Sequence, residues 1–271
     1  MNGKQVVSAL HSGSPVYGTL VTSPSPTLPP LLRPLGLDLV FIDTEHVPID
    51  RAMLSWMCRA YDALELAPMV RIPEPAPCRA SMVLDGGARG VLAPYVETPQ
   101  QVRALVGAVK LRPLKGRRLD QFLAGEAPLE PELMAYLEEC NAGNFLIVNV
   151  ESTPAIEVLD EILSVPGLDA LLIGPHDLSC SLGIPEQYDH PRFEEVVRRI
   201  LKAARSHGAG GGVHFWREPE RQIEWAKAGA NLIMHHGDNS AFIQTLQRDI
   251  EMVRGALEDL RASAARIEAP V

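Results

Sequence analysis

The residues that could do chemistry lie where short apolar runs of the chain give way to polar side chains. The richest such place is the end of the run at Phe41, where Asp43, Glu45 and His46 follow closely. A carboxylate beside an imidazole orients the ring and stabilises its charged form, as a general acid or base requires. We therefore predict that His46 and Asp43 act together in proton transfer.

Two more carboxylates follow later apolar runs. Glu151 comes directly after Val150, and Asp177 lies just beyond the run that ends at Ile173. Oxygen ligands of this kind, with water in the other positions, suit Mg²⁺ or Mn²⁺ and a chelating oxo-acid. Each could instead cap a helix, but neighbouring carboxylates repel unless a cation or an arginine lies between them. The pair predicts a divalent metal site.

Arg71 also ends an apolar run, where a guanidinium is costly unless it meets an anion. Two interpretations are open: it holds the oxygen of a developing enolate, or it forms a structural salt bridge to Asp43 or Glu45. Four other histidines follow predicted strands, and for each we favour an ordinary hydrogen-bonding role: His176, His214, His235 and His236.

The elements that must position these residues alternate along the chain. Short runs rich in Val, Ile and Leu predict buried parallel strands at 16–21, 38–43, 67–72, 89–93, 145–151, 169–173, 211–214 and 231–235. Amphipathic segments of helical length lie between them, at 50–63, 99–109, 154–163, 191–206, 219–228 and 239–260. We predict a (β/α)8 TIM barrel, in which the carboxyl ends of all strands meet at one mouth. An open doubly wound sheet is the alternative, weakened because no G-x-G-x-x-G follows the first strand.

Two stretches do not fit the alternation of strands and helices. Residues 23–30 are rich in proline and predict a turn that delays the first helix, and residues 111–128 predict an irregular loop. Each is interpreted either as a surface loop or as a lid over the site.

The composition limits the possible functions. The 271 residues, 46% of them hydrophobic, suit a single barrel domain over 1–271. The net charge of -9 argues against a nucleic-acid partner and favours a small molecule. Four cysteines without a C-x-x-C pair indicate reduced thiols. Without a targeting or membrane segment in the sequence, a cytoplasmic location is expected.

Several short motifs, in this order and spacing, carry a family resemblance. They are Val70-Arg71-Ile72-Pro73, Leu84-Asp85-Gly86-Gly87-Ala88, Glu151-Ser152 and Ile173-Gly174-Pro175-His176-Asp177-Leu178-Ser179. With them the chain resembles the HpcH/HpaI aldolase family, the metal-dependent class II pyruvate aldolases related to citrate lyase β-subunits. The resemblance covers nearly the whole chain.

The resemblance implies a barrel of the phosphoenolpyruvate/pyruvate-binding type, a homohexamer or trimer of dimers with an exchanged C-terminal helix, and a divalent metal, Mg²⁺, Mn²⁺ or Co²⁺. Glu151 and Asp177 look like the metal ligands, Arg71 like the residue that stabilises the enolate oxygen, and His46 with Asp43 like the acid/base dyad. Asp85 matches a carboxylate near the mouth, often of a neighbouring subunit. The substrate would contact Arg71, Asn149 and the turn of Gly174, Pro175 and His176.

The function implied is cleavage of a 4-hydroxy-2-oxo acid through a metal-bound pyruvate enolate. The chain departs from the aldolase pattern at Asn149, His176, His235, His236 and the shortened loop at 111–118. This altered rim is similar to a branch of the family that makes citrate from oxaloacetate and acetyl-CoA in siderophore biosynthesis of the staphyloferrin B type. Citrate synthase activity is therefore the alternative, and the second substrate stays open.

Overall fold

The computed structural model describes residues 1–267, with side chains described to residue 258. Eight parallel strands, each paired with its neighbours in sequence, close into a barrel in the order β1 to β8. They are β1 (Val16–Val21), β2 (Leu39–Asp43), β3 (Ala67–Arg71), β4 (Gly90–Ala93), β5 (Phe145–Asn149), β6 (Ala170–Ile173), β7 (Gly210–Phe215) and β8 (Leu232–Gly237). Every predicted strand is present, the barrel is confirmed, and the open-sheet alternative is wrong.

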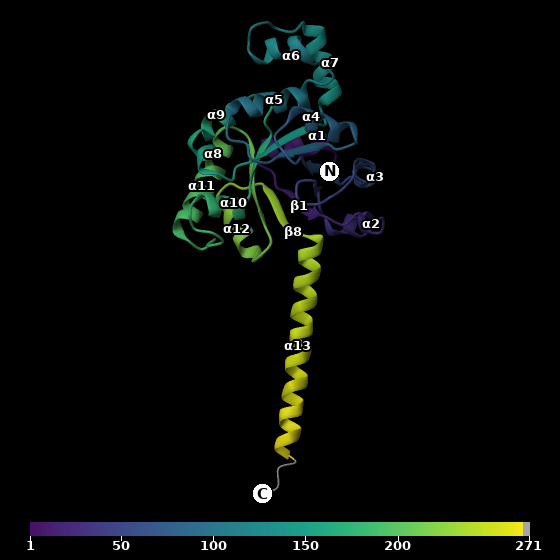
Figure 1. Cartoon of the computed structure of the whole chain (residues 1–271), viewed down its shortest axis with the longest axis vertical. Helices are drawn as coiled ribbons and strands as arrows, with labels where there is room; N and C mark the ends of the chain where they lie inside the picture. Colours follow the sequence, from purple (N-terminus) through teal and green to yellow (C-terminus); the bar gives the residue numbers. More distant parts are fainter. Residues whose placement is uncertain (268–271) are drawn as a thin grey trace.

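Helices surround the barrel, and most of those that follow a strand begin with proline in the first turn, where its missing N–H costs little. They are α1 (Gly3–Ser12), α2 (Leu28–Leu32) with a 3₁₀ turn η1 (Arg33–Leu35), α3 (Arg51–Asp62), α4 (Pro77–Asp85), α5 (Pro99–Lys110), α6 (Gly116–Leu123), α7 (Pro131–Asn141), α8 (Thr153–Glu157), α9 (Leu159–Leu163), α10 (Pro175–Ser181), α11 (Pro191–Ser206), α12 (Pro219–Lys227) and α13 (Asp238–Ile267). Figure 1 shows this arrangement.

The core has two layers because side chains alternate across each strand. Phe41 and Met69 belong to a cluster inside the barrel, whereas Ile42 and Val70 pack between the strands and the helices. Helix α1, which the sequence did not predict, closes the amino end of the barrel with buried side chains such as Leu10. Every second residue of a strand therefore points into the barrel. Polar residues at inward-pointing positions near the strand ends lie at the mouth.

The stretch predicted as an irregular loop at 111–128 contains helix α6. Leu119, Phe122 and Leu123 of α6 pack around buried Leu137 of α7 in a small separate cluster. In Figure 1, α6 and α7 lie at the end of the barrel opposite to α13, which leaves from the carboxyl end of β8. This segment therefore does not form a lid over the mouth of its own barrel.

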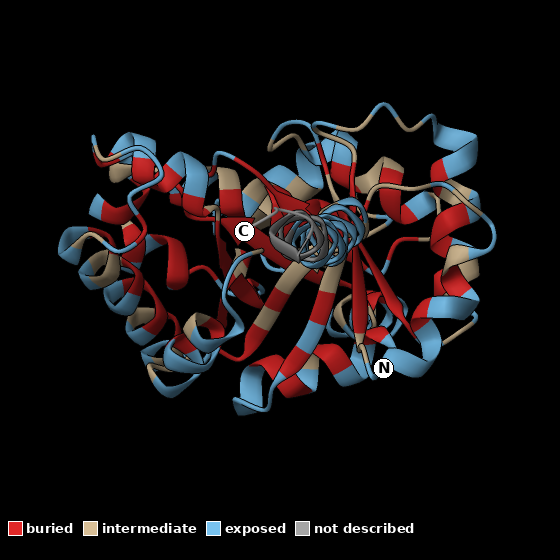
Figure 2. Cartoon of the chain, turned by 90° about the horizontal axis from the view of Figure 1, so that it is seen from below, coloured by how far each residue is buried: buried red, intermediate tan, exposed pale blue. Residues whose placement is uncertain are grey.

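Helix α13 leaves the carboxyl end of β8 and extends away from the barrel as a long rod (Figure 1). Viewed along this rod in Figure 2, the strands are largely buried, and the side chains of α13 are exposed from Phe242 to residue 258. Over residues 1–267, no helix has both the length and the apolar character needed to cross a membrane.

Candidate active site at the carboxyl end of the barrel

Asp43 and Arg71, the last residues of β2 and β3, meet in a buried ion pair at the mouth. Arg71 Nε lies 2.8 Å from Asp43 Oδ1, and Nη2 lies 2.7 Å from Oδ2. Burial alone would raise the pKa of Asp43, but the bonds and charge of Arg71 bring it below its usual value. The salt bridge weighed from the sequence is thus present, and it fixes a guanidinium at the carboxyl end of the barrel.

Glu45 joins this pair to His46. Its Oε2 lies 3.0 Å from Arg71 Nε and 3.6 Å from His46 Nε2. The sequence predicted Asp43 as the carboxylate that orients His46, whereas the structure places Glu45 in that position and gives Asp43 to Arg71. From the sequence, Glu45 was considered only as a structural salt-bridge partner of Arg71, a contact that the structure contains, and its place beside His46 was not used.

Glu151 follows β5 at the mouth and is a buried carboxylate. Its Oε1 accepts a hydrogen bond from Tyr95 N at 2.9 Å, and the turn at Gly174 packs so closely that a Cβ there would overlap Oε2. Burial raises the pKa of Glu151 to about 7, and the charges of Asp177 and Glu45 add to this effect.

These carboxylates fit a divalent cation. Glu151 is buried within reach of the charge of Asp177, which stands in the first turn of α10, and a cation between them would relieve their repulsion. Among residues 1–267, no group of three or more His, Cys, Asp or Glu side chains is arranged as a complete metal site. Two carboxylates alone would leave coordination positions for oxygen atoms of water or substrate, and their role as metal ligands stays a prediction.

Asn149, at the end of β5, adds an unsatisfied polar atom to the same place. Its Nδ2 donates to Leu172 O at 3.2 Å, but its buried Oδ1 has no hydrogen-bond partner. Buried polar atoms are nearly always paired, so an orphaned acceptor indicates a place for a ligand or a water. This supports the predicted contact between Asn149 and substrate, which stays a prediction.

Tyr95 is a residue of the mouth that the sequence did not indicate. It follows β4 with a φ of 52°, in the left-handed region, and this conformation directs its N–H to Glu151. Its partial burial and its contact with Glu45 raise the pKa of its hydroxyl to about 12. A backbone donor of this kind has no signal in residue type, which explains why it was missed.

Two of the predicted site residues lie apart from this cluster within one chain. Asp85 is the last residue of α4 and pairs with Arg112 on an exposed surface. His176 is exposed in α10, with its Nδ1 3.7 Å from Glu186. The structure brings neither of them to Glu151, and the expected role of Asp85 at a neighbouring subunit's mouth stays a prediction.

A parallel barrel whose mouth holds an ion-paired arginine, a rim histidine and two carboxylates is the arrangement expected of a metal-dependent aldolase. The chain belongs to the HpcH/HpaI aldolase/citrate lyase family, whose model matches residues 19–245. The expected family, fold and enzyme class, a lyase, are confirmed.

Individual relatives agree with this assignment. The 2-keto-3-deoxy-L-rhamnonate aldolase of Klebsiella pneumoniae subsp. pneumoniae is 32% identical over 248 residues, which are 90% of this chain and 91% of that protein. Among solved structures, an HpcH/HpaI aldolase/citrate lyase family protein from Burkholderia cenocepacia J2315 is similar with a TM-score of 0.79 and 28% identity, covering 93% of this chain and 99% of that one. The citrate synthase SbnG has the same TM-score and identity, covering 93% and 98%.

Proposed function

We propose that the protein is a divalent-metal-dependent aldolase that cleaves a 4-hydroxy-2-oxo acid into pyruvate and an aldehyde. The observation that carries the proposal is the network in which Asp43 and Glu45 hold the Arg71 guanidinium beside Glu151. Glu151 and Asp177 would hold Mg²⁺, Mn²⁺ or Co²⁺. When bound, such a cation polarises the 2-oxo group of the substrate and so stabilises negative charge that develops there.

Arg71 is suited to the same negative charge. Burial alone would lower its pKa, but its bonds to Asp43 and the charges of Glu45 and Glu151 raise the pKa above its usual value. The guanidinium therefore stays protonated and fixed in position. A fixed cation aimed at the oxygen of a developing enolate needs no reorganisation during the reaction, which is the main source of electrostatic catalysis.

His46, an exposed side chain beside Glu45, is the group that would move a proton. In the cleavage direction it takes the proton of the C4 hydroxyl while the C3–C4 bond breaks. The bonding electrons pass to the 2-oxo group to form an enolate, and the C4 oxygen becomes the aldehyde carbonyl. A proton returned to C3 then completes pyruvate. Glu45 Oε2, 3.6 Å from His46 Nε2, would orient the ring for this transfer.

The relatives favour this reaction over the alternative. The Klebsiella protein that is 32% identical is named for a deoxy sugar acid, and a sugar-acid substrate yields a hydroxylated aldehyde beside pyruvate. Citrate formation from oxaloacetate and acetyl-CoA is the second candidate, because the structure is also similar to the citrate synthase SbnG. Citrate formation joins an enolate carbon to a carbonyl carbon, as the aldolase reaction does when it runs in the direction of synthesis.

One experiment separates the two candidates. The purified protein is supplied with Mg²⁺, Mn²⁺ or Co²⁺ and screened against 4-hydroxy-2-oxo acids, including deoxy sugar acids, while pyruvate release is followed. Release of CoA thiol from acetyl-CoA is followed in parallel with and without oxaloacetate. Pyruvate release supports the aldolase. Oxaloacetate-dependent thiol release without pyruvate release would replace it with the citrate synthase.

A further inference from the structure

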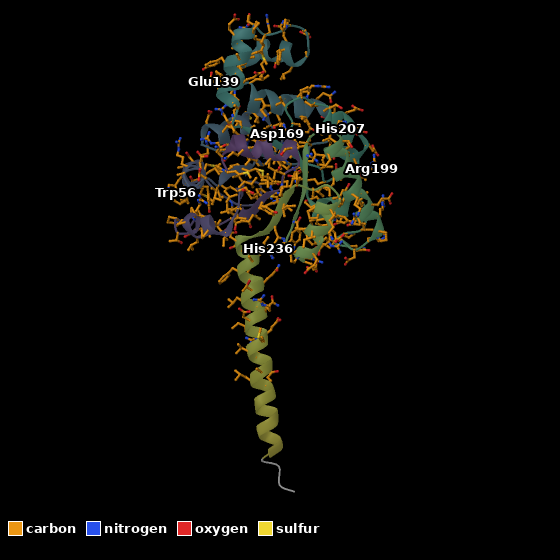
Figure 3. All side chains as sticks on the ribbon, turned by 180° about the vertical axis from the view of Figure 1, so that it is seen from behind. Trp56, Glu139, Asp169, Arg199, His207 and His236 are labelled. Carbon is orange, nitrogen blue, oxygen red and sulfur yellow. The ribbon has the colours of Figure 1, made fainter. Side chains whose placement is uncertain are left out.

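Three histidines occupy the arc of the mouth formed by the ends of β7 and β8, where the proposed reaction uses no side chain. His214 belongs to the inner face of β7, because its neighbours Val213 and Phe215 pack outside the barrel. The rings of His235 and His236 at the end of β8 are 4.4 Å apart. Figure 3 shows His236 where the barrel meets α13.

His214 adjoins the catalytic arginine across one aromatic ring. Its ring meets that of Phe41 edge to face at a centroid distance of 5.5 Å, and Arg71 Cζ lies 5.2 Å from the same Phe41 ring. The proposed metal ligands come from the β5 and β6 side of the barrel. His214 lies on β7, the neighbour of β6 in the barrel, so its ring borders the same mouth. In the proposed reaction this position is left for the substrate atoms beyond C4.

A single hydrogen bond determines which nitrogen of His214 carries a proton. Nε2 lies 3.0 Å from the backbone oxygen of His236, and because a carbonyl only accepts, Nε2 must donate. Burial lowers the pKa of His214 to about 4, which keeps the ring neutral at ordinary pH. Nδ1 is then a lone-pair acceptor, and within the described side chains it has no hydrogen-bond partner.

The partner carbonyl is held in place by strained backbone. His236 has a φ of 55°, which is uncommon for a residue other than glycine. Strained residues of this kind persist where the surrounding structure requires them and gather at functional sites. The Nδ1 atom of His236 is also buried without a partner, so this corner holds polar atoms that a bound molecule would satisfy.

We propose that His214 is a specificity-determining residue, whose Nδ1 accepts a hydrogen bond from a hydroxyl group on the aldehyde half of the substrate. The proposal rests on the proposed aldolase function and defines its substrate class as 2-oxo acids that yield hydroxyaldehydes. A plain alkyl aldehyde leaves Nδ1 unpaired, and a carboxylate or thioester presents only acceptor oxygens to it.

The test measures kcat/KM for the addition of pyruvate to glycolaldehyde and to acetaldehyde, which differ by one hydroxyl group. The ratio of the two values is compared between proteins, so that the intrinsic reactivity of the aldehydes cancels. The decisive variant is His214→Gln, whose amide nitrogen reaches as far as Nε2 and still donates to His236 while the acceptor at Nδ1 is gone. We expect it to lower the ratio about tenfold, the worth of one hydrogen bond.

Two further variants make the interpretation specific. His214→Asn places an amide oxygen near the position of Nδ1, and we expect its ratio to stay within about threefold of the wild-type ratio, since the acceptor is retained. His214→Phe fills the same space against Phe41 and should lose the preference as His214→Gln does. If His214→Gln does not fold, His214→Phe replaces it in the test. His207→Gln, on a histidine at the end of α11, is the matched control and should leave the ratio unchanged.

Exchange of the C3 hydrogens of pyruvate for deuterium, followed by NMR, reports enolate formation without any aldehyde. Wild-type protein that fails to exchange with every metal would contradict the aldolase function itself. If the wild-type protein does exchange these hydrogens, but His214→Gln and His214→Phe have the same glycolaldehyde-to-acetaldehyde ratio as the wild type, the role of His214 alone is overturned.

Discussion

At the scale of single residues, the position of the Glu151 carboxylate depends on the missing side chain of Gly174. A Cβ at 174 would overlap Glu151 Oε2, so the carboxylate would have to turn away and strain the hydrogen bond that its Oε1 accepts from Tyr95 N. We expect Gly174→Ala to lower kcat/KM at least tenfold through misplacement of a metal ligand, with little loss of fold. Gly143→Ala is the control, because a Cβ there would meet Lys4 only at 3.9 Å. Equal activity in both variants would contradict this account.

The raised pKa of Glu151 predicts opposite effects of pH on metal-free and metal-bound protein. A carboxyl group whose pKa is higher in the folded state, about 7 against 4.5, binds its proton more tightly when folded. The metal-free protein should therefore lose stability as pH rises from about 4.5 to about 7, as urea unfolding in EDTA would show. The affinity for Mn²⁺, measured by calorimetry, should rise over the same range because binding requires the carboxylate.

Glu151→Gln is the control for both measurements, since an amide does not titrate there. In this variant, the part of the pH-dependent stability loss that comes from residue 151 should disappear. Mn²⁺ binding should be weaker at all pH values. Asp189→Asn, an exposed carboxylate paired with Arg221, should alter neither curve beyond about 0.5 kcal/mol. Mn²⁺ affinity that is independent of pH in the wild type would show that Glu151 is not a ligand.

Residue types at strand ends were enough to predict which side chains share the mouth, but not which of them pair. Asp43, Arg71 and Asn149 end strands, so the barrel rule alone places them together. The choice between Asp43 and Glu45 as partner of His46 depends on the path of the turn after β2. That path is set by contacts such as the hydrogen bond from Glu45 N to Asp43 Oδ1, which no spacing rule contains.

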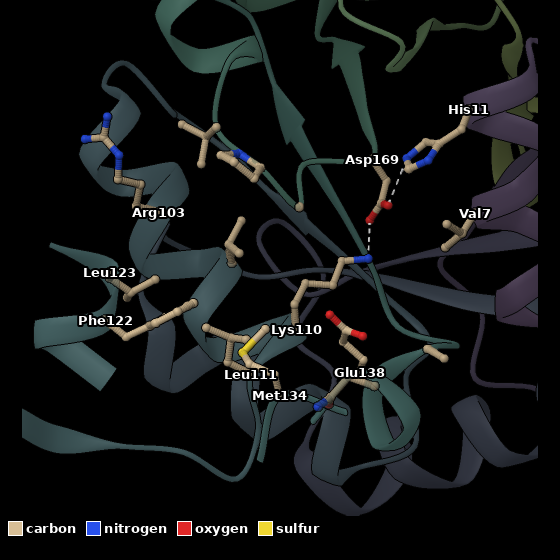
Figure 4. Close-up of a pocket in the computed structure, with 16 residues that line it drawn as sticks. Val7, His11, Arg103, Lys110, Leu111, Phe122, Leu123, Met134, Glu138 and Asp169 are labelled. Carbon is tan, nitrogen blue, oxygen red and sulfur yellow. Dashed lines mark ion pairs between the residues drawn. The ribbon is translucent and has the colours of Figure 1, made fainter. Parts of the chain in front are cut away.

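At the scale of elements, a buried ion pair joins α5 and α1 to the start of β6, beside a cavity of about 630 Å³ at the end of the barrel away from the mouth (Figure 4). Asp169 is buried, with Lys110 Nζ at 2.7 Å from Oδ2 and His11 Nε2 at 3.2 Å from Oδ1. Its Oδ2 also accepts from Leu146 N. These bonds tie two helices to two strands.

Lys110→Met should leave the buried Asp169 carboxylate with His11 as its remaining ion-pair partner. We expect a loss of about 3–5 kcal/mol in the free energy of unfolding. Urea unfolding at neutral pH measures it. Lys227→Met is the control, because Lys227 forms an exposed pair with Glu224 and should cost less than about 1 kcal/mol. The double variant Lys110→Met, Asp169→Asn should recover part of the loss, and no recovery would contradict an ionic cause.

The strands were predictable because parallel strands buried on both faces read as continuous apolar runs. Helix α6 was not, since its apolar residues Leu119, Phe122 and Leu123 are few and it begins at Gly116 after a proline. These residues are fixed by packing against α7 around Leu137 rather than by local propensity. The residue pattern of a single segment does not predict tertiary contacts of that kind.

At the scale of the whole molecule, α13 carries an apolar stripe that its own chain leaves uncovered. The exposed residues recur every three or four positions, as on one side of a helix: Phe242, Leu246, Ile250, Val253 and Leu257. A monomer in water seldom leaves a contiguous stripe of this length bare. The family resemblance predicts that the helix is exchanged with a second copy in a homo-oligomer, and the stripe gives that prediction its physical reason.

Leu246→Glu with Val253→Glu places two charges seven residues apart on this stripe. If the stripe is buried against another copy, the two carboxylates would lose their water on assembly, so we expect the variant to dissociate to smaller species than the wild type. Light scattering after size-exclusion chromatography measures the masses. Gln247→Glu with Arg254→Glu puts charges at the same spacing one residue further on, outside the stripe, and should keep the wild-type mass. A wild-type monomer, or equal masses for both variants, would show that α13 joins no second copy.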